Sequence, residues 1–193
     1  MKARVWKSIC DAVDQGNDAA LWLQDFLAQP VRLVRMADDF RRALNPQFAR
    51  SERDTTGFAD GYPFLLVSQA SLDDLNARLT TQGAMPVPMN RFRPNIVLDG
   101  IDAHDEDHIE QLEIDTAEGP VVLKLVKPCS RCSIPDVDPA LGTTGHSVGD
   151  TLATYRSDPR VGGAVTFGMN AIVLSGIEHV LRVGQHGRAS FKF

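Results

Sequence analysis

Short apolar runs between glycine- and proline-rich turns dominate the chain after residue 90, and they constrain its fold more than any other feature. The length and β-branched content of strands recur in the runs 95–98, 121–126, 167–174 and 179–183. Helical patterns do not alternate regularly with these runs, as a doubly wound sheet requires. The sequence therefore predicts an α+β fold, with a mostly antiparallel or mixed β-barrel-like core and a few peripheral helices.

Helical spacing of apolar residues occurs in three places. A helix is predicted over 17–29, where Pro30 ends it, and a short one over 148–156. Another helix begins near Ser71, which with Asp74 approximates a capping box. We expect strands before and after the polar segment that separates the helix over 17–29 from the helix at Ser71.

These flanking strands are predicted over 31–36 and 62–68. Between them, residues of about 38–61 are polar and charged, and Pro46 interrupts any periodic pattern. A connection of this length is expected to be a flexible loop.

The bulk numbers predict a single domain over residues 1–193. A net charge of -5 argues against nucleic-acid binding, which needs clustered basic residues. The chain has no apolar run of the ~18 residues that a membrane span needs, and its first residues do not resemble a secretory signal. Its three cysteines cannot form an even disulfide framework. These features predict a cytoplasmic protein with no membrane partner.

Two of the cysteines form the motif Cys129-Ser-Arg-Cys132. A structural zinc site needs a second pair of Cys or His ligands, which the chain does not offer near this motif. A thioredoxin-like redox pair needs a helix after the motif, which Pro135 and Pro139 oppose. A single working thiolate is favoured by the positive charge of Arg131 and of Lys127, which lowers a nearby thiol pKa. Two buried cysteines that only fill space have about equal weight from spacing alone.

A second candidate is the segment 90–95, which carries Arg91, Arg93 and Asn95. If the segment is extended, as Pro94 favours, these three side chains project to one side. Two guanidinium groups beside an amide suit an anionic ligand such as a phosphate. The alternative from composition is a solvated basic strand edge.

Two further features are weaker signals. The N-terminus of the helix at Ser71 favours negative charge, as helix N-termini do. His104 and His108 stand among four carboxylates over 102–108, a pattern more typical of a solvated acidic loop than of a metal site.

Taken together, several motifs resemble one family in order and spacing. They are Phe58–Ser68, Ser71–Asn76, Arg91–Val97, Pro128–Cys132 and Asp138–Pro139. The family is the MOSC domain, the molybdenum-cofactor-sulfurase C-terminal-like domain, as found in the mitochondrial amidoxime-reducing component and its bacterial relatives. The resemblance runs from about Leu21 to Gly184, which is nearly the whole chain.

The resemblance implies a cofactor, a metal ligand and a reaction. The second cysteine of the motif, Cys132, would coordinate the molybdenum of a molybdenum cofactor (Mo-molybdopterin), and Arg93 and Asn95 would contact its pterin. Ser71 would lie near the cofactor, and Arg91 and Arg131 complete the expected binding set. A soft, anionic thiolate is a suitable molybdenum ligand. The implied reaction is the reduction of a small N-hydroxylated substrate.

The chain also departs from the family pattern. We expect it to lack the family's N-terminal β domain and the C-terminal ferredoxin domain of bacterial relatives. Electrons would then come from an external donor, ferredoxin-like or cytochrome b5-like, or from a missing domain. An alternative function is a non-catalytic MOSC module that carries cofactor or sulfur for a partner protein.

Overall fold

The computed structural model describes residues 1–49 and 54–192. The chain divides into two compact units, Met1–Pro63 and Phe64–Phe193, where the sequence predicts one domain. The first unit has a sheet of its own, whose strands pair only with one another.

The first unit is built on a three-stranded antiparallel sheet. Its strands are β1 (Lys2–Val5), β2 (Ser8–Asp14) and β3 (Val34–Met36), in the order β1-β2-β3. The third strand was expected over 31–36, whereas the first two give no clear alternation in the sequence. Burial of Cys10 and Ala12 on β2 gives this sheet its apolar side.

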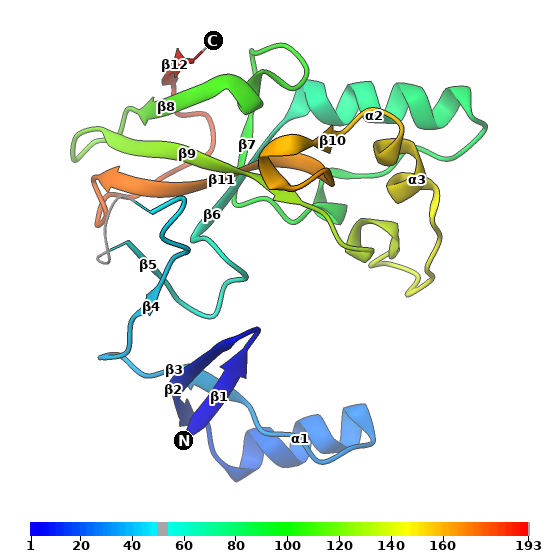
Figure 1. Ribbon diagram of the computed structural model, residues 1–193. Helices are drawn as coiled ribbons and strands as arrows, with labels where there is room; N and C mark the ends of the chain where they lie inside the picture. The colour runs from blue at the N-terminus through cyan, green and yellow to red at the C-terminus, as the bar shows by residue number, and fades with distance from the viewer. Residues whose placement is uncertain (50–53, 193) are drawn as a thin grey trace. The chain divides into compact units, whose positions relative to one another are not determined.

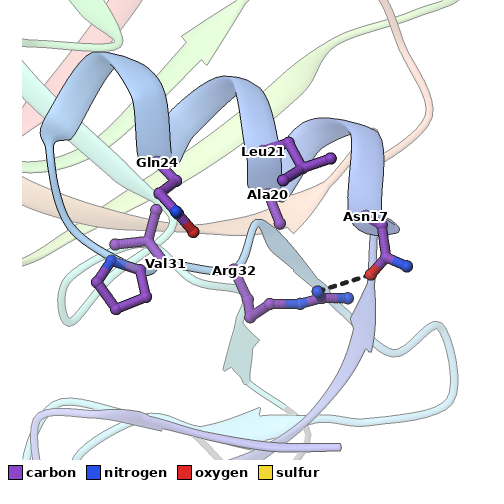
Figure 2. Close-up of a pocket in the computed structure, with 7 residues that line it drawn as sticks. Asn17, Ala20, Leu21, Gln24, Val31 and Arg32 are labelled. Carbon is purple, nitrogen blue, oxygen red and sulfur yellow. Dashed lines mark hydrogen bonds between the residues drawn. The ribbon is translucent and has the colours of Figure 1, made fainter.

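Helix α1 (Asn17–Leu27) connects β2 to β3 and confirms the helix expected over 17–29. It ends at Ala28, whose left-handed backbone stops it before Pro30. Figure 2 shows Arg32 reaching back to α1, where its Nη1 donates to the side-chain oxygen of Asn17 at 2.9 Å. A hollow of about 490 Å³ lies between α1 and this returning segment.

The predicted flexible loop over about 38–61 contains a short strand pair in its described part. Strand β4 (Arg42–Ala43) pairs antiparallel with β5 (Thr55–Thr56). Arg42 is buried and donates to the carbonyls of Ala59 and Asp60, which folds the segment onto itself. Residues 50–53 lie outside the described residues, and the loop's mobility stays a prediction.

The second unit is a curled, mixed sheet that forms a half-barrel (Figure 1). The strand order is β12-β8-β9-β11-β6-β7, with β10 added beside β11. Only the pair β6 and β7 is parallel. The strands are β6 (Phe64–Ser68), β7 (Ile96–Leu98), β8 (Ile109–Ile114), β9 (Val121–Ser130), β10 (Ser157–Asp158), β11 (Ala164–Ser175) and β12 (Gly187–Phe191). The predicted α+β fold with a barrel-like core is confirmed.

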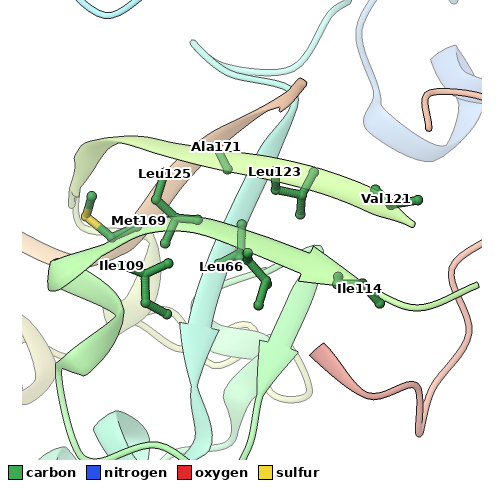
Figure 3. Packing of buried hydrophobic residues seen from close by; sticks show 9 residues of the cluster. Leu66, Ile109, Ile114, Val121, Leu123, Leu125, Met169 and Ala171 are labelled. Atoms are coloured by element: carbon green, nitrogen blue, oxygen red, sulfur yellow. The ribbon is translucent and has the colours of Figure 1, made fainter. Parts of the chain in front are cut away.

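Apolar side chains from the middle strands fill the inside of this half-barrel (Figure 3). Burial alternates along β9, so that every second residue from Val121 to Leu125 points inward. At Gly168 on β11, a Cβ atom would lie 2.5 Å from the carbonyl oxygen of Leu66, and φ is +77°. Only glycine allows this close approach of β11 to β6.

Two α-helices and four short 3-10 turns complete the second unit. Helices α2 (Gln69–Thr81) and α3 (Ser147–Ala153) pack against each other (Figure 1) and cover a second apolar cluster that includes Phe92 and Phe167. The turns are η1 (Met89–Arg91), η2 (Asp105–His108), η3 (Ile134–Asp136) and η4 (Pro159–Val161). Among the described residues, no helix has the length and apolarity to cross a membrane.

The strand expected over 179–183 is wrong. Leu181 packs partly against the core, but Val180 is half exposed and Val183 is fully exposed, and the run pairs with no described strand. The last strand is instead β12, which pairs with β8. The sequence did not suggest β8, because its buried residues Ile109, Leu112 and Ile114 do not follow a strict period of two.

Burial raises the pKa of Tyr62 and of Tyr155 to about 12, from an ordinary value of 10. The folded state therefore holds both phenolic protons more tightly than the unfolded chain does. This contribution to stability is fully present below pH 10 and is lost as the pH rises from 10 to about 12. We expect the tyrosinate absorbance of the native protein to have its midpoint near pH 12, and that of the denatured protein near 10. Equal midpoints would contradict this expectation.

Candidate functional site

The cysteine motif lies where the longest strand pair of the second unit ends. Ser130, the last residue of β9, still pairs with Thr166 of β11, and the N–H of Arg131 donates to the carbonyl of Val165 at 2.8 Å. The chain then leaves the sheet as the cysteine loop, residues 131–138. Cys132 is exposed at the start of this loop and Cys129 is half-buried. Cys132 is thus exposed to solvent where the strand pair β9 and β11 ends.

Arg131 connects the cysteine motif to the segment that was expected to bind an anion. Its Nη1 donates to Sγ of Cys129 at 3.2 Å, and its Nη2 donates to the carbonyl of Phe92 at 3.1 Å. The positive charge of Arg131, expected beside the working thiolate, therefore lies next to Cys129. Phe92 is fully buried, so this bond ties the motif to the core.

The prediction that residues 90–95 are extended is wrong. Met89–Arg91 form the 3-10 turn η1, and Arg93 has φ of +55°. The N–H groups of Arg91 and Phe92 bond back to the carbonyls of Pro88 and Met89, and these turn bonds override the preference that Pro94 imposes. Arg91, Arg93 and Asn95 therefore do not project together as alternate residues of one strand.

The turn sends the two arginines to different places. Arg91 is only 11% exposed, and its Nη2 lies 2.8 Å from Oδ2 of Asp138. Arg93 is exposed, and its guanidinium has no partner among residues 1–49 and 54–192. A left-handed backbone at a residue other than glycine is strained, and such strain is concentrated at functional sites. Arg93 is the better candidate of the two to bind an anion.

Asn95 helps to hold the parallel strands β6 and β7 in register. Its Oδ1 accepts from the N–H of Leu65 at 2.8 Å, and its own N–H donates to the carbonyl of Leu65 at 2.9 Å. The amide nitrogen of the side chain has no partner in the described part of the chain, and Asn95 borders a hollow of about 610 Å³. A role for Asn95 in cofactor binding stays a prediction. Because Oδ1 is occupied, the amide nitrogen of the side chain would be the group that bonds to the cofactor.

Ser71 is buried in the first turn of α2, three residues after the residue that caps the helix. The helix is capped by Ser68, whose Oγ accepts from the N–H of Ser71 at 3.0 Å. The Ser71 hydroxyl donates to the carboxylate of Glu106 at 2.7 Å, and it accepts from the N–H of His104 at 2.8 Å. Because its one proton is used, Ser68 must be the donor in the 2.7 Å contact between the two hydroxyls.

The Ser71 hydroxyl therefore has every hydrogen-bonding position filled by the protein itself. The anion that stabilises the N-terminus of α2 is the buried carboxylate of Glu106, which also accepts from the N–H of Ser68 at 3.1 Å. Ser71 as a cofactor contact remains a prediction, and the geometry gives it a structural role.

The expectation of a solvated acidic loop over 102–108 is wrong for two of its residues. Glu106 and Asp107 are buried, at 1% and 6% exposure. Asp107 forms an ion pair with Arg156 at 2.6 Å, in which both side chains are nearly buried. The partners of both carboxylates lie more than 30 residues away in the sequence, so no local pattern indicates these contacts.

Asp138 is held in its ionised form at the end of the cysteine loop. Its Oδ1 accepts from the N–H groups of Ala140 and Leu141, at 2.9 and 3.2 Å. The bond from Ala140 lowers the pKa of Asp138 most, followed by that from Leu141 and by the charge of Arg91. The carboxylate is therefore available to Arg91 at neutral pH.

The residues present fit a molybdenum cofactor in the chemistry of their donors. Cys132 is exposed beside a hollow of about 280 Å³, and the guanidinium of Arg93 is paired with no described residue. The Nε–H of Arg131 is buried without an acceptor in the described residues. No group of three or more His, Cys, Asp or Glu side chains among those residues is arranged to hold a metal ion. A metal at Cys132 would have one ligand from this set.

Comparison with known proteins gives consistent matches. The MOSC domain family matches residues 53–187. Human mitochondrial amidoxime-reducing component 1 is 39% identical over 163 residues, which cover 82% of this chain and 46% of that protein. The mouse component 1 is 38% identical over 147 residues, covering 74% and 41%. Human component 2 is 36% identical over 149 residues, covering 74% and 42%.

The chain thus spans less than half the length of these curated relatives. The family match nevertheless extends over more than half of the chain and includes the half-barrel strands from β6 to β11, the cysteine loop and the Arg93 turn. The protein belongs to the MOSC domain family.

Proposed function

We propose that this chain is the molybdenum-cofactor-binding part of an oxidoreductase that reduces small N-hydroxylated compounds. One observation carries the proposal: Arg131 bonds the cysteine motif to the carbonyl of Phe92, the residue before Arg93. An exposed thiol and an unpartnered guanidinium are thereby connected through a single, partly buried side chain. The names of the curated relatives, which are amidoxime-reducing components, support the same class of reaction.

In this proposal each residue has a separate task. Cys132, as a thiolate, is the molybdenum ligand that the protein supplies. Arg93 binds an anionic group of the cofactor, and the side-chain amide of Asn95 donates a hydrogen bond to its pterin. When bound, the cofactor supplies the two-electron redox centre for the reaction N–OH plus two electrons and two protons to N–H and water. The protein orients this centre and keeps Cys132 accessible.

Electrons must reach such a centre from outside the described residues. We propose an external donor, ferredoxin-like or cytochrome b5-like, or a further domain of a longer protein. All three cysteines are free thiols, which a reducing compartment preserves, and this supports the proposal of a cytoplasmic location.

Turnover tests the proposed reaction. The protein is loaded with molybdenum cofactor, and reduction of benzamidoxime to benzamidine is followed with a chemical electron donor. We expect turnover by the wild type, and a loss of at least ~100-fold in Cys132→Ala, because the metal loses its protein ligand. Cys129→Ala is the matched control and should stay within about threefold, because Cys129 makes only weak sulfur hydrogen bonds. A loaded protein that retains molybdenum but does not reduce the substrate would instead support a carrier module.

A further inference from the structure

Two arginines connect the cysteine loop and the turn before Arg93 in opposite directions. Arg91, on the turn, donates from Nη1 to the carbonyl of Pro135 at 3.2 Å and from Nη2 to Asp138 at 2.8 Å. Arg131, on the loop, donates back to the carbonyl of Phe92 at 3.1 Å. The two segments are thus bound to each other at both ends of the loop.

Arg91 has little freedom to do anything else. Its side chain is 11% exposed, and both terminal nitrogens are used by the cysteine loop. Asp138 is equally committed, because Oδ1 closes the turn to Ala140 and Leu141 and Oδ2 faces Arg91. Of the three guanidinium nitrogens of Arg91, only Nε has no acceptor among the described residues, and this atom is buried.

A third contact fixes the middle of the loop. Oδ1 of Asp136 accepts from the N–H groups of Val148 and Gly149, at 3.0 and 3.1 Å, at the start of α3. A Cβ atom on residue 149 would lie 2.8 Å from Oδ2 of the same carboxylate, so the glycine permits this approach. The far end of the loop is held by the contact between Arg91 and Asp138 and by the backbone, where the N–H of Asp138 donates to the carbonyl of Thr143 at 2.7 Å.

We propose that Arg91 and Asp138 are positioning residues, which set the distance between the Cys132 thiol and Arg93 without contacting the cofactor. This inference rests on the proposed function, in which Cys132 holds the metal and Arg93 an anionic part of the same cofactor. A rigid ligand binds two such points well only when their separation is fixed beforehand. The positioning role of Arg91 differs from the direct cofactor contact that the family resemblance implies.

The charge of Asp138 separates positioning from direct contact. If Arg91 binds the anionic cofactor directly, Asp138 competes with it, and Asp138→Asn should lengthen cofactor retention. If Arg91 acts by holding the loop, the same change weakens the ion pair and should shorten retention. The two roles thus predict effects of opposite sign from one nearly isosteric substitution.

The first measurement is the half-time of molybdenum loss from cofactor-loaded protein. We expect Arg91→Ala and Asp138→Asn each to shorten it about tenfold, a change typical of a lost charge-assisted hydrogen bond. Arg91→Lys keeps the charge but cannot bond two acceptors in fixed directions, and should shorten it about threefold. The double variant should be no worse than either single one, because both remove the same contact. Arg188→Ala breaks two exposed ion pairs of β12 and should leave retention unchanged.

The second measurement is hydrogen exchange of the protein without cofactor. Amides of the cysteine loop should exchange about tenfold faster in Arg91→Ala and in Asp138→Asn, but at the wild-type rate in Arg188→Ala. Amides of β9 and β11 should be unchanged in all variants, which shows that the half-barrel remains folded.

The outcomes separate this inference from the proposed function. Unchanged or longer retention in Asp138→Asn, with molybdenum bound to the wild type, overturns the positioning role alone. Unchanged exchange of the loop also overturns it. A wild-type protein that retains no molybdenum overturns the proposed function, and the positioning role with it, whatever the exchange data show.

Discussion

Glu106→Ala is expected to lower the free energy of unfolding by about 3 kcal/mol, because it leaves buried donors without an acceptor and opens a cavity. The Glu106 carboxylate accepts from the hydroxyl of Ser71 and from the N–H of Ser68, and the side chain is 1% exposed. In the variant, the Ser71 hydroxyl and the first turn of α2 lose the anion that they surround.

Chemical denaturation with far-UV circular dichroism measures this loss. Glu106→Gln keeps one acceptor oxygen and nearly the same volume, so it should cost only about 1 to 2 kcal/mol. Glu178→Ala is the matched control at an exposed position and should change the free energy by less than about 0.5 kcal/mol. A Glu106→Ala protein as stable as the control would show that the carboxylate does not hold α2 to the η2 turn.

The elements that the sequence predicts well are those with local patterns. The helices over 17–29 and near Ser71, the strand over 121–126 and the apolar run of β11 follow from periodicity within a few residues. The α+β class and the barrel-like core follow from the order of these elements. The position of the cysteine motif at the end of β9 was not predicted, because the expected strand over 121–126 stops short of it.

The contacts that the sequence does not predict are those between residues that lie far apart in the sequence. Arg91, Asp138 and Pro135 come together across more than 40 residues, and the turn at 89–91 that aims Arg91 has no strong local signal. The division into two compact units also has no local signal, because the first sheet pairs short strands whose apolar residues are few. The single domain expected from the bulk numbers stays a prediction.

Replacing Cys132 with alanine should remove molybdenum binding almost completely. Cys132 is exposed on the cysteine loop, whereas Cys129 is half-buried against Arg131 and Cys10 is buried in the first unit. Thiolate is the soft ligand type in the set, and no group of three metal-binding side chains is found in the described residues to take its place. Both alanine variants remove one sulfur, so Cys129→Ala controls for the loss of a thiol near the site.

The most direct test is the molybdenum retained per chain after cofactor loading and removal of free cofactor, measured by elemental analysis. We expect the wild type and Cys129→Ala to retain similar amounts, and Cys132→Ala to retain less than about a tenth of them. Hydrogen exchange of β9 and β11 confirms that the three proteins are equally folded. Equal molybdenum in Cys132→Ala and the wild type would contradict the assignment of Cys132 as the metal ligand, on which the proposed function depends.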